Sequence, residues 1–395
     1  MKRDFMFASE SVTEGHPDKL CDQISDAIVD RFLAEDPCAR VIAECAVATA
    51  VVFVAARFSS RATVDFPNIA RQVIGQIGYA DHEFNARTCS VLTSLKDLGP
   101  DGGCEDERTL SEEEIDRVPA KNQVTVFGFA CTQTPALMPL PIWLAHRLAR
   151  RLAEVRRQGL LPYLTPDGKT QVGVEYRDGR PSRIHGIAIT AAQTEEHPGL
   201  ARVREELRET VIGHVFRDEL LRPTAKTNIY INPEGLFLIG GPSAHSGLTG
   251  RKNAIDTYGE YSRHSGKALS GKDPLRIDRV GAYAARYAAK NVVAAGLASE
   301  CEVQLSYTIG LSRPVSVQVE TFGTGRLPDD LIAAALVRHF DFRLLGIVRQ
   351  FNLRRLPATT RGGFYRKLAA YGHVGRTDIE LPWEATDKAG LLRGG

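Results

Sequence analysis

The chain has 395 residues, with 50 Lys and Arg against 48 Asp and Glu, so its formal net charge at pH 7 is +2. This near-neutral balance argues against a general nucleic-acid binder, which needs a basic footprint, and no apolar stretch is long enough to cross a bilayer. The length and a hydrophobic content of 43% predict a large core divided over two or three domains.

The seven cysteines are scattered along the chain and never take the spacing of a metal knuckle. This pattern fits a reducing compartment and predicts that most of them are small core residues. No charged-then-apolar leader appears near the N-terminus, so we expect a cytoplasmic protein.

The first predicted element is a helix that begins at Pro17, where proline is favoured in a first turn. Its apolar positions recur at helical spacing up to Phe32. Residues 15–19 place an imidazole, a carboxylate and an ammonium at this helix start, a combination that suits polyphosphate and metal chemistry. A simple helix cap explains the same five residues equally well.

Residues 41–58 form a β-branched run that predicts one or two strands. Glu44 interrupts this run, and the pattern alone favours a side chain that faces solvent. Residues 96–121 lack a core pattern and are rich in glycine and acidic side chains, so they predict a linker or mobile loop.

The rest of the chain alternates predicted strands and helices. We expect strands at 124–130, 171–176, 184–190, 228–232, 236–239, 302–309 and 315–321, and helices at 139–157, 200–216, 278–295 and 328–340. This order predicts three blocks of a repeated α+β unit, with domains at 1–103, 115–232 and 233–395.

A glycine-rich loop at 240–271 leads into residues 266–273, which have the spacing of a phosphate-binding P-loop. Asp273 stands where Ser or Thr should hold magnesium, so a P-loop nucleotidase is disfavoured. The loop and its surroundings still concentrate cations within 26 residues, namely Arg251, Lys252, Lys267, Lys272 and Arg276. Such a cluster predicts a polyphosphate ligand, and a solvated basic loop is the alternative.

Two further candidates have no role that spacing alone assigns. Asp167-Gly168-Lys169 is typical of a turn with an exposed lysine, and His245 is a loop histidine. Asp273 and Asp278 are the carboxylates near the basic loop that could hold magnesium.

Blocks spread over nearly the whole chain resemble the S-adenosylmethionine synthetase (methionine adenosyltransferase) family. They lie at residues 9–19, 137–139, 240–242, 247–252, 256–259, 270–274, 282–287 and 370–373. The resemblance implies three related α+β domains about a pseudo-threefold axis, in a homodimer or homotetramer with active sites at the subunit interface. It also implies adenosyl transfer from ATP to the sulfur of methionine, followed by hydrolysis of the triphosphate, with Mg2+ and K+ assisting.

The resemblance assigns roles by position. His16 would stabilise the departing triphosphate, Asp18 and Asp278 would hold Mg2+, and Glu44 would be a K+ ligand. The phosphate contacts would be Lys169, Arg251, Lys252, Lys272 and Arg276, and further ATP-binding positions would be Asp167, Phe237, Leu238 and Ala268, with Phe237 beside the adenine. A sulfide is a neutral nucleophile, so catalysis must stabilise the charge that gathers on the leaving group.

The chain departs from the family pattern on the methionine side. Arg57 stands where the family usually has a glutamate that receives the methionine ammonium, and His245 stands where it has an aspartate. Leu98 replaces a glutamine and Asn122 replaces a loop aspartate. These changes leave three alternatives open: transfer to a more anionic acceptor, a catalytically degenerate regulatory paralogue, and a triphosphatase.

Overall fold

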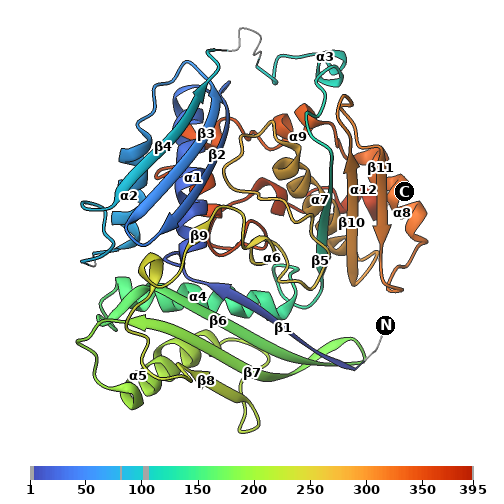
Figure 1. The fold of residues 1–395 in the computed structure, drawn as a ribbon. Coiled ribbons are helices and arrows are strands. Elements are labelled where there is room, and N and C mark those ends of the chain that lie inside the picture. Colours follow the sequence, from blue (N-terminus) through green and yellow to red (C-terminus); the bar gives the residue numbers. More distant parts are fainter. Residues whose placement is uncertain (1–3, 81, 101–105, 394–395) are drawn as a thin grey trace.

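The computed structural model describes residues 4–80, 82–100 and 106–393, and its strands form three sheets flanked by helices (Figure 1). The α+β class and the three-block organisation predicted from the sequence are confirmed. None of the helices in the described ranges combines the length and the apolar character that a bilayer crossing requires.

The first sheet is built from the β-branched run near the N-terminus, in the order β4-β3-β2-β9. Its strands are β2 (Arg40–Ala48), β3 (Val51–Ser59), β4 (Ser90–Asp97) and β9 (Gly247–Leu248). Burial alternates along β2 and β3, because successive side chains of a strand point to opposite faces. Helices α1 (Pro17–Glu35) and α2 (Phe66–Ile77) pack on one face only.

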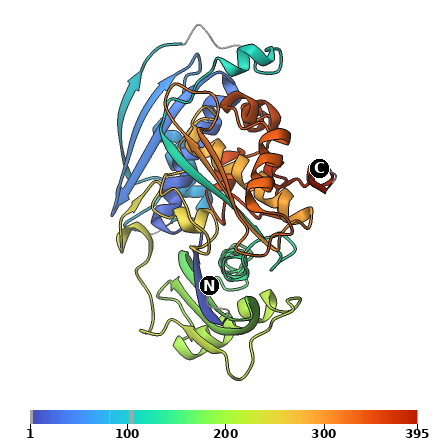
Figure 2. The same ribbon diagram turned by 90° about the vertical axis from the view of Figure 1, so that its right-hand side faces the viewer.

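The second sheet has the order β1-β6-β7-β8 and carries the central part of the chain. Its strands are β1 (Phe5–Val12), β6 (Leu164–Arg177), β7 (Arg180–Gln193) and β8 (Asn228–Ile231). Helix α4 (Leu140–Arg157) packs against β1 and β6, and Figure 2 shows it nearly end-on between this sheet and the rest of the molecule. Helix α5 (Leu200–Leu207) continues into a π-helical turn at Arg208–Gly213.

The third sheet has the order β11-β10-β5 and packs against the C-terminal helices (Figure 1). Its strands are β5 (Val124–Cys131), β10 (Glu300–Tyr307) and β11 (Ser316–Glu320). Helix α7 (Ile277–Ala294) covers β5 and β10, and α8 (Asp329–His339) covers β11. Gly128 of β5 lies under α7, where a Cβ atom would be 1.9 Å from the backbone of Ala285.

The remaining helices are short and join these layers. They are α3 (Glu112–Asp116), α6 (Asn253–Asp256), α9 (Leu344–Gln350), α10 (Leu356–Thr359), α11 (Tyr365–Leu368) and α12 (Ala389–Arg393). Both α10 and α11 pack against α1, so the C-terminal part of the chain supports its first helix.

Each sheet takes one strand from a distant part of the chain. β1 pairs with β6, β5 pairs with β10, and β9 pairs with β2, all antiparallel. The domains at 1–103, 115–232 and 233–395 stay a prediction, because the sheets exchange strands across these limits.

Three predictions of local structure were wrong. Asp167-Gly168-Lys169 is not a turn but lies inside β6. Within the described residues, 236–239 form no strand: the turn after β8, with Asn232 and Gly235 at positive φ, leads the chain away from the sheet edge. Part of the predicted linker at 96–121 is the helix α3, in which Ser111 and Glu114 form a capping box and acidic side chains occupy the first turn. Residues 101–105 of that segment lie outside the described ranges.

The sequence analysis did not predict α2, although its signals are present. Asp65 caps the helix by accepting a hydrogen bond from the Asn68 amide, and Gly78 ends it in the left-handed conformation. The prediction that most cysteines are small core residues is confirmed, since five are free and buried, namely Cys21, Cys45, Cys89, Cys131 and Cys301. Cys38 is half-buried and disulfide-bonded, which does not fit the prediction of a reducing compartment.

Candidate active site

His16 is the N-cap of α1, and its Nδ1 accepts a hydrogen bond from the Asp18 amide at 3.2 Å. The side chain is buried, and burial lowers the pKa of His16 to about 3, so the imidazole is neutral at pH 7. Gly15 precedes it at a close approach, where a Cβ atom would lie 2.3 Å from Pro166. His16 therefore caps the helix through Nδ1 and still has Nε2 free of the cap hydrogen bond.

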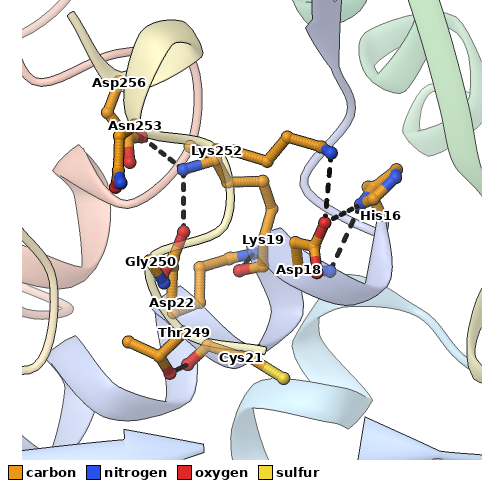
Figure 3. A network of polar contacts seen from close by, with 12 residues as sticks. His16, Asp18, Lys19, Cys21, Asp22, Thr249, Gly250, Lys252, Asn253 and Asp256 are labelled. Atoms are coloured by element: carbon orange, nitrogen blue, oxygen red, sulfur yellow. Dashed lines mark hydrogen bonds and ion pairs between the residues drawn. The ribbon is translucent and has the colours of Figure 1, made fainter. Parts of the chain in front are cut away.

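Asp18 gathers cations from the glycine-rich loop at the start of α1. Its Oδ2 lies 3.2 Å from Lys252 Nζ (Figure 3). Its Oδ1 lies 3.7 Å from the Arg251 guanidinium and accepts a hydrogen bond from the Leu248 amide at 3.0 Å. Asp18 is buried, whereas Arg251 is half exposed. One carboxylate thus holds two cationic side chains beside His16.

Asp167 of β6 and His245 complete what we name the helix-start cluster, which comprises His16, Asp18, Asp167, His245, Arg251 and Lys252. His245 Nε2 lies 3.1 Å from Asp167 Oδ2, and the His16 and His245 rings are 4.9 Å apart. Burial opposes ionisation of Asp167, but the hydrogen bond from His245 and the Gly241 amide outweigh it and lower the pKa of Asp167. The cluster draws on three distant segments of the chain, at residues 16–18, 167 and 245–252.

The other predicted ATP-binding positions of this region lie nearby with fewer contacts. Lys169 is exposed on β6, two residues after the buried Asp167. The Phe237 carbonyl accepts the Gln193 amide at 2.9 Å, and Leu238 is 42% exposed. Ala268 packs against Gly250, where a Cβ atom would lie 2.4 Å from its own Cβ.

A second set of predicted residues meets at the start of α7, and we name Asn122, Lys272, Arg276 and Asp278 the α7 cluster. Asn122 Nδ2 lies 2.9 Å and 3.0 Å from the two Asp278 oxygens, and Lys272 Nζ lies 3.6 Å from Oδ1. Burial lowers the pKa of Lys272, although Asp278 acts against this. Arg276 Nε lies 3.7 Å from Asp273 Oδ2. In the described parts of the chain, no hydrogen bond or ion pair joins this cluster directly to the helix-start cluster.

Arg57 and Leu98 line one cavity of about 560 Å³ together with Arg276 and Lys121. The methionine-side positions of the sequence analysis therefore lie beside the α7 cluster, except His245, which belongs to the helix-start cluster. Glu44 is exposed on β2, on the same strand face as Ile42, which bridges to Lys272. The solvent-facing interpretation of Glu44 is confirmed.

Four aspartates of α1, which we name the aspartate ladder, position these loops and were not predicted from the sequence. Asp18, Asp22, Asp26 and Asp30 recur every four residues on α1, so they lie along one helix face. Each accepts backbone amide hydrogens from a distant loop: Asp18 from Leu248, Asp22 from Gly250, Asp26 from Gly271, and Asp30 from Phe364, Tyr365 and Arg366. The four-residue spacing of acids in a helix was the signal that could have found it.

The sequence predicts that the Lys19 ammonium adds positive charge at the helix start, but this side chain points into the protein. It is fully buried and forms ion pairs with Asp22, at 2.8 Å, and with Asp256 of α6 (Figure 3). The Lys19 ammonium is therefore neutralised inside the protein, where its ion pairs join α6 to α1.

The donor sets of Asp18 and Asp278 fit a hard divalent cation. Each is a buried carboxylate whose neighbours are lysine, arginine or amide groups, which also suit phosphate oxygens. Magnesium takes one or two carboxylates and completes its shell with phosphate oxygens and water. Two such carboxylates at two helix starts can therefore hold a magnesium–polyphosphate ligand.

Comparison with known proteins accounts for nearly the whole chain. Family models described as the N-terminal, central and C-terminal domains of S-adenosylmethionine synthetase match residues 4–100, 117–237 and 239–385. The S-adenosylmethionine synthase of Synechococcus sp. (strain JA-3-3Ab) is 52% identical over 402 residues, covering 98% of this chain and 97% of that protein. The enzyme of the same name from Trichormus variabilis is 51% identical over 408 residues, covering 100% and 97%.

Proposed function

The chain belongs to the S-adenosylmethionine synthetase family, and we propose that it transfers the adenosyl group of ATP to the sulfur of L-methionine through the helix-start cluster. Water then hydrolyses the released triphosphate, so the products are S-adenosylmethionine, phosphate and diphosphate. The single observation that carries the assignment of the site is the neutral imidazole of His16 beside the Asp18–Lys252 ion pair at the start of α1.

The reaction places its demand on the leaving group. The methionine sulfur uses a lone pair to form a bond to C5′ of ATP, and the C5′–O bond breaks with its electrons on the triphosphate. The sulfur is neutral and becomes a sulfonium, so negative charge gathers on the departing oxygen. His16 would donate a hydrogen bond to that oxygen, while Lys252 and Arg251 would hold the phosphates by charge-assisted hydrogen bonds.

We assign Mg2+ to Asp18 and Asp278 and K+ to Glu44. Bound Mg2+ would neutralise phosphate charge, while these carboxylates orient the phosphates against the lysine and arginine side chains. Arg276, Lys272 and Lys169 would serve as further phosphate contacts, and Asp167, Phe237, Leu238 and Ala268 would hold the nucleoside part.

We further propose that the helix-start cluster of one subunit meets the α7 cluster of a second subunit. The exposed face of the first sheet supports this, because its register aligns Leu248, Ala46, Phe53 and Leu92 in one row across the four strands. Leu248, Phe53 and Leu92 are 45%, 41% and 54% exposed, an unusual row for a sheet face in water. A homodimer would cover this row and bring Arg57, Leu98 and Asn122 to the methionine side of the partner's site.

The three alternatives raised by the sequence are not favoured, because the relatives that cover the full chain are S-adenosylmethionine synthases. The test is incubation of the protein with ATP, L-methionine, Mg2+ and K+, with products identified by mass spectrometry. We expect S-adenosylmethionine with phosphate and diphosphate. Cleavage of ATP to adenosine and triphosphate, with no sulfonium product, would overturn the proposal.

A further inference from the structure

His16, Asp167 and His245 bring three metal-binding groups together from three distant segments. One ligand atom of each residue lies within 4.8 Å of the others. His16 and Asp167 are buried in the protein, whereas the His245 side chain is one-third exposed on a loop. Of the residues in the described ranges, these three form the one such cluster that contains histidine.

Only one of the two Asp167 carboxylate oxygens accepts hydrogen bonds within the described residues. Its Oδ2 accepts hydrogen bonds from the Gly241 amide at 2.8 Å and from His245 at 3.1 Å. Its Oδ1 is buried and has no hydrogen-bond partner among the described residues, although Asp167 as a whole is 2% exposed. A buried, unpaired carboxylate oxygen costs free energy unless a ligand satisfies it, and a cation is the ligand that such an oxygen favours.

We propose that His16, Asp167 and His245 form a binding site for one divalent transition-metal ion, such as Zn2+. Two imidazole nitrogens and one carboxylate oxygen are a donor set for first-row transition metals, with open positions left for water. This set differs from the carboxylate and phosphate oxygens that suit Mg2+, so the two kinds of ion would occupy different residues.

Asp18 lies behind His16 and would orient its imidazole toward the proposed metal ion. His16 Nδ1 faces Asp18 and lies 3.8 Å from its Oδ2, so Nε2 is the nitrogen left for the metal. On binding, the His16 proton moves to Nδ1, where it faces the Asp18 carboxylate and replaces the hydrogen bond from the Asp18 amide. Metal-ligating histidines commonly donate their second nitrogen to a carboxylate in this way. In His245 the metal takes the place of the proton on Nε2, which moves to Nδ1.

The nearby cations do not cancel the charge that the metal needs. Lys252 and Arg251 both pair with Asp18, which leaves the Asp167 carboxylate to the ion. The consequence of metal binding rests on the proposed function: an ion on His16 withholds the imidazole from the triphosphate, and the metal therefore inhibits adenosyl transfer. Binding itself is independent of that function.

The test measures metal binding to the full chain without ATP or methionine. After treatment with a chelator, the protein is titrated with Zn2+ in a calorimeter and with Co2+ under a visible spectrophotometer. We expect one ion per chain and a Co2+ spectrum of low coordination number. His245→Ala should weaken binding by at least about tenfold, since even outer-shell partners contribute that much.

A matched control exists on β7. His185 Nδ1 lies 3.1 Å from Glu175 Oε1, so these two residues repeat the histidine–carboxylate pair, and among the described residues no third metal-binding side chain groups with them. His185→Ala should bind Zn2+ as the unaltered chain does. Asp167→Asn, which keeps the side-chain shape, should lose binding as His245→Ala does, and circular dichroism checks that both variants fold.

Three results would overturn the metal site: no stoichiometric binding, unchanged binding in His245→Ala, or an equal loss in His185→Ala. Normal Zn2+ binding by a chain that makes no S-adenosylmethionine would leave the metal site standing and overturn the proposed function alone.

Discussion

Asn122 donates its side-chain amide to both oxygens of Asp278, with Nδ2 at 2.9 Å from Oδ1 and 3.0 Å from Oδ2. These hydrogen bonds stabilise the buried Asp278 carboxylate without adding a charge to the site. Asn122→Asp would instead place two carboxylates against each other and lose the hydrogen bonds, at a cost of about 1–3 kcal/mol in the absence of metal. We expect a lower unfolding temperature in a chelator, recovery on adding Mg2+, and a lower Mg2+ concentration for half-maximal activity.

The control for that prediction is Asn122→Ala, which removes the donors but adds no charge. Its unfolding temperature should fall without a new response to Mg2+. Identical Mg2+ titrations of the two variants would contradict the assignment of Mg2+ to Asp278.

His16 combines a cap with a proposed chemical role, and two substitutions separate them. His16→Asn keeps a side chain that caps helices well, whereas His16→Ala loses the cap and about 1 kcal/mol of stability. Both variants should lower kcat by about 100- to 1000-fold, the loss typical of one donor to a developing negative charge, with little change in KM for ATP. Steady-state kinetics and thermal unfolding measure the two effects, and normal turnover by His16→Asn would refute the chemical role.

Acid should destabilise the protein through its buried histidines, and His146 of α4 offers a clean case. Its Nδ1 contacts Ser11 Oγ at 2.8 Å, and burial lowers the pKa of His146 to about 3. The unfolded chain therefore binds a proton that the folded chain does not between pH 6.5 and about 3. Stability contributed by this residue is complete above the unfolded pKa and is lost as the pH falls through that window.

His146→Asn removes the titration while keeping a polar partner for Ser11. We expect the loss of stability between pH 6 and pH 4 to be shallower in this variant by up to about 1.4 kcal/mol per pH unit. Urea unfolding at several pH values measures the slope. Parallel slopes for the variant and the unaltered chain would show that His146 is not held neutral by burial.

The exposed row of the first sheet predicts how subunits associate. Phe53→Asp would put a charge in the centre of that row, so we expect sedimentation to show monomers and activity to fall by at least about tenfold. Leu220→Asp is the control, because Leu220 is fully exposed away from this sheet and should leave both properties unchanged. Assembly and activity that survive Phe53→Asp would place the contact elsewhere.

The sequence predicted the elements whose signal is local. Pro17 marked the start of α1 and the β-branched residues marked β2 and β3, because proline geometry and strand periodicity act over a few residues. The strand expected at 236–239 failed since an apolar run becomes a strand only beside a free sheet edge, which sequence does not reveal.

Long-range contacts at the site were beyond the local patterns. Spacing gave His245 no role, yet the fold sets it 3.1 Å from Asp167, a residue 78 positions away. The sequence pattern predicted that Lys19 adds positive charge for an anion at the helix start, but the ion pair with Asp256 holds its side chain inside the protein. The family resemblance supplied the positions that pattern could not, and the roles of individual residues stay predictions for the experiments above.

The four aspartates of α1 depend on loops that the ribosome makes much later than the helix itself. This helix leaves the ribosome early, but the amides that its carboxylates accept belong to residues 248–271 and 364–366. Until those segments have been synthesised, the aspartate side chains of α1 lack the backbone amides that they accept in the folded protein. The start of α1 around His16 is therefore made early but finds its partners only when residues 245–252 have been synthesised, and its far end waits for residues 364–366.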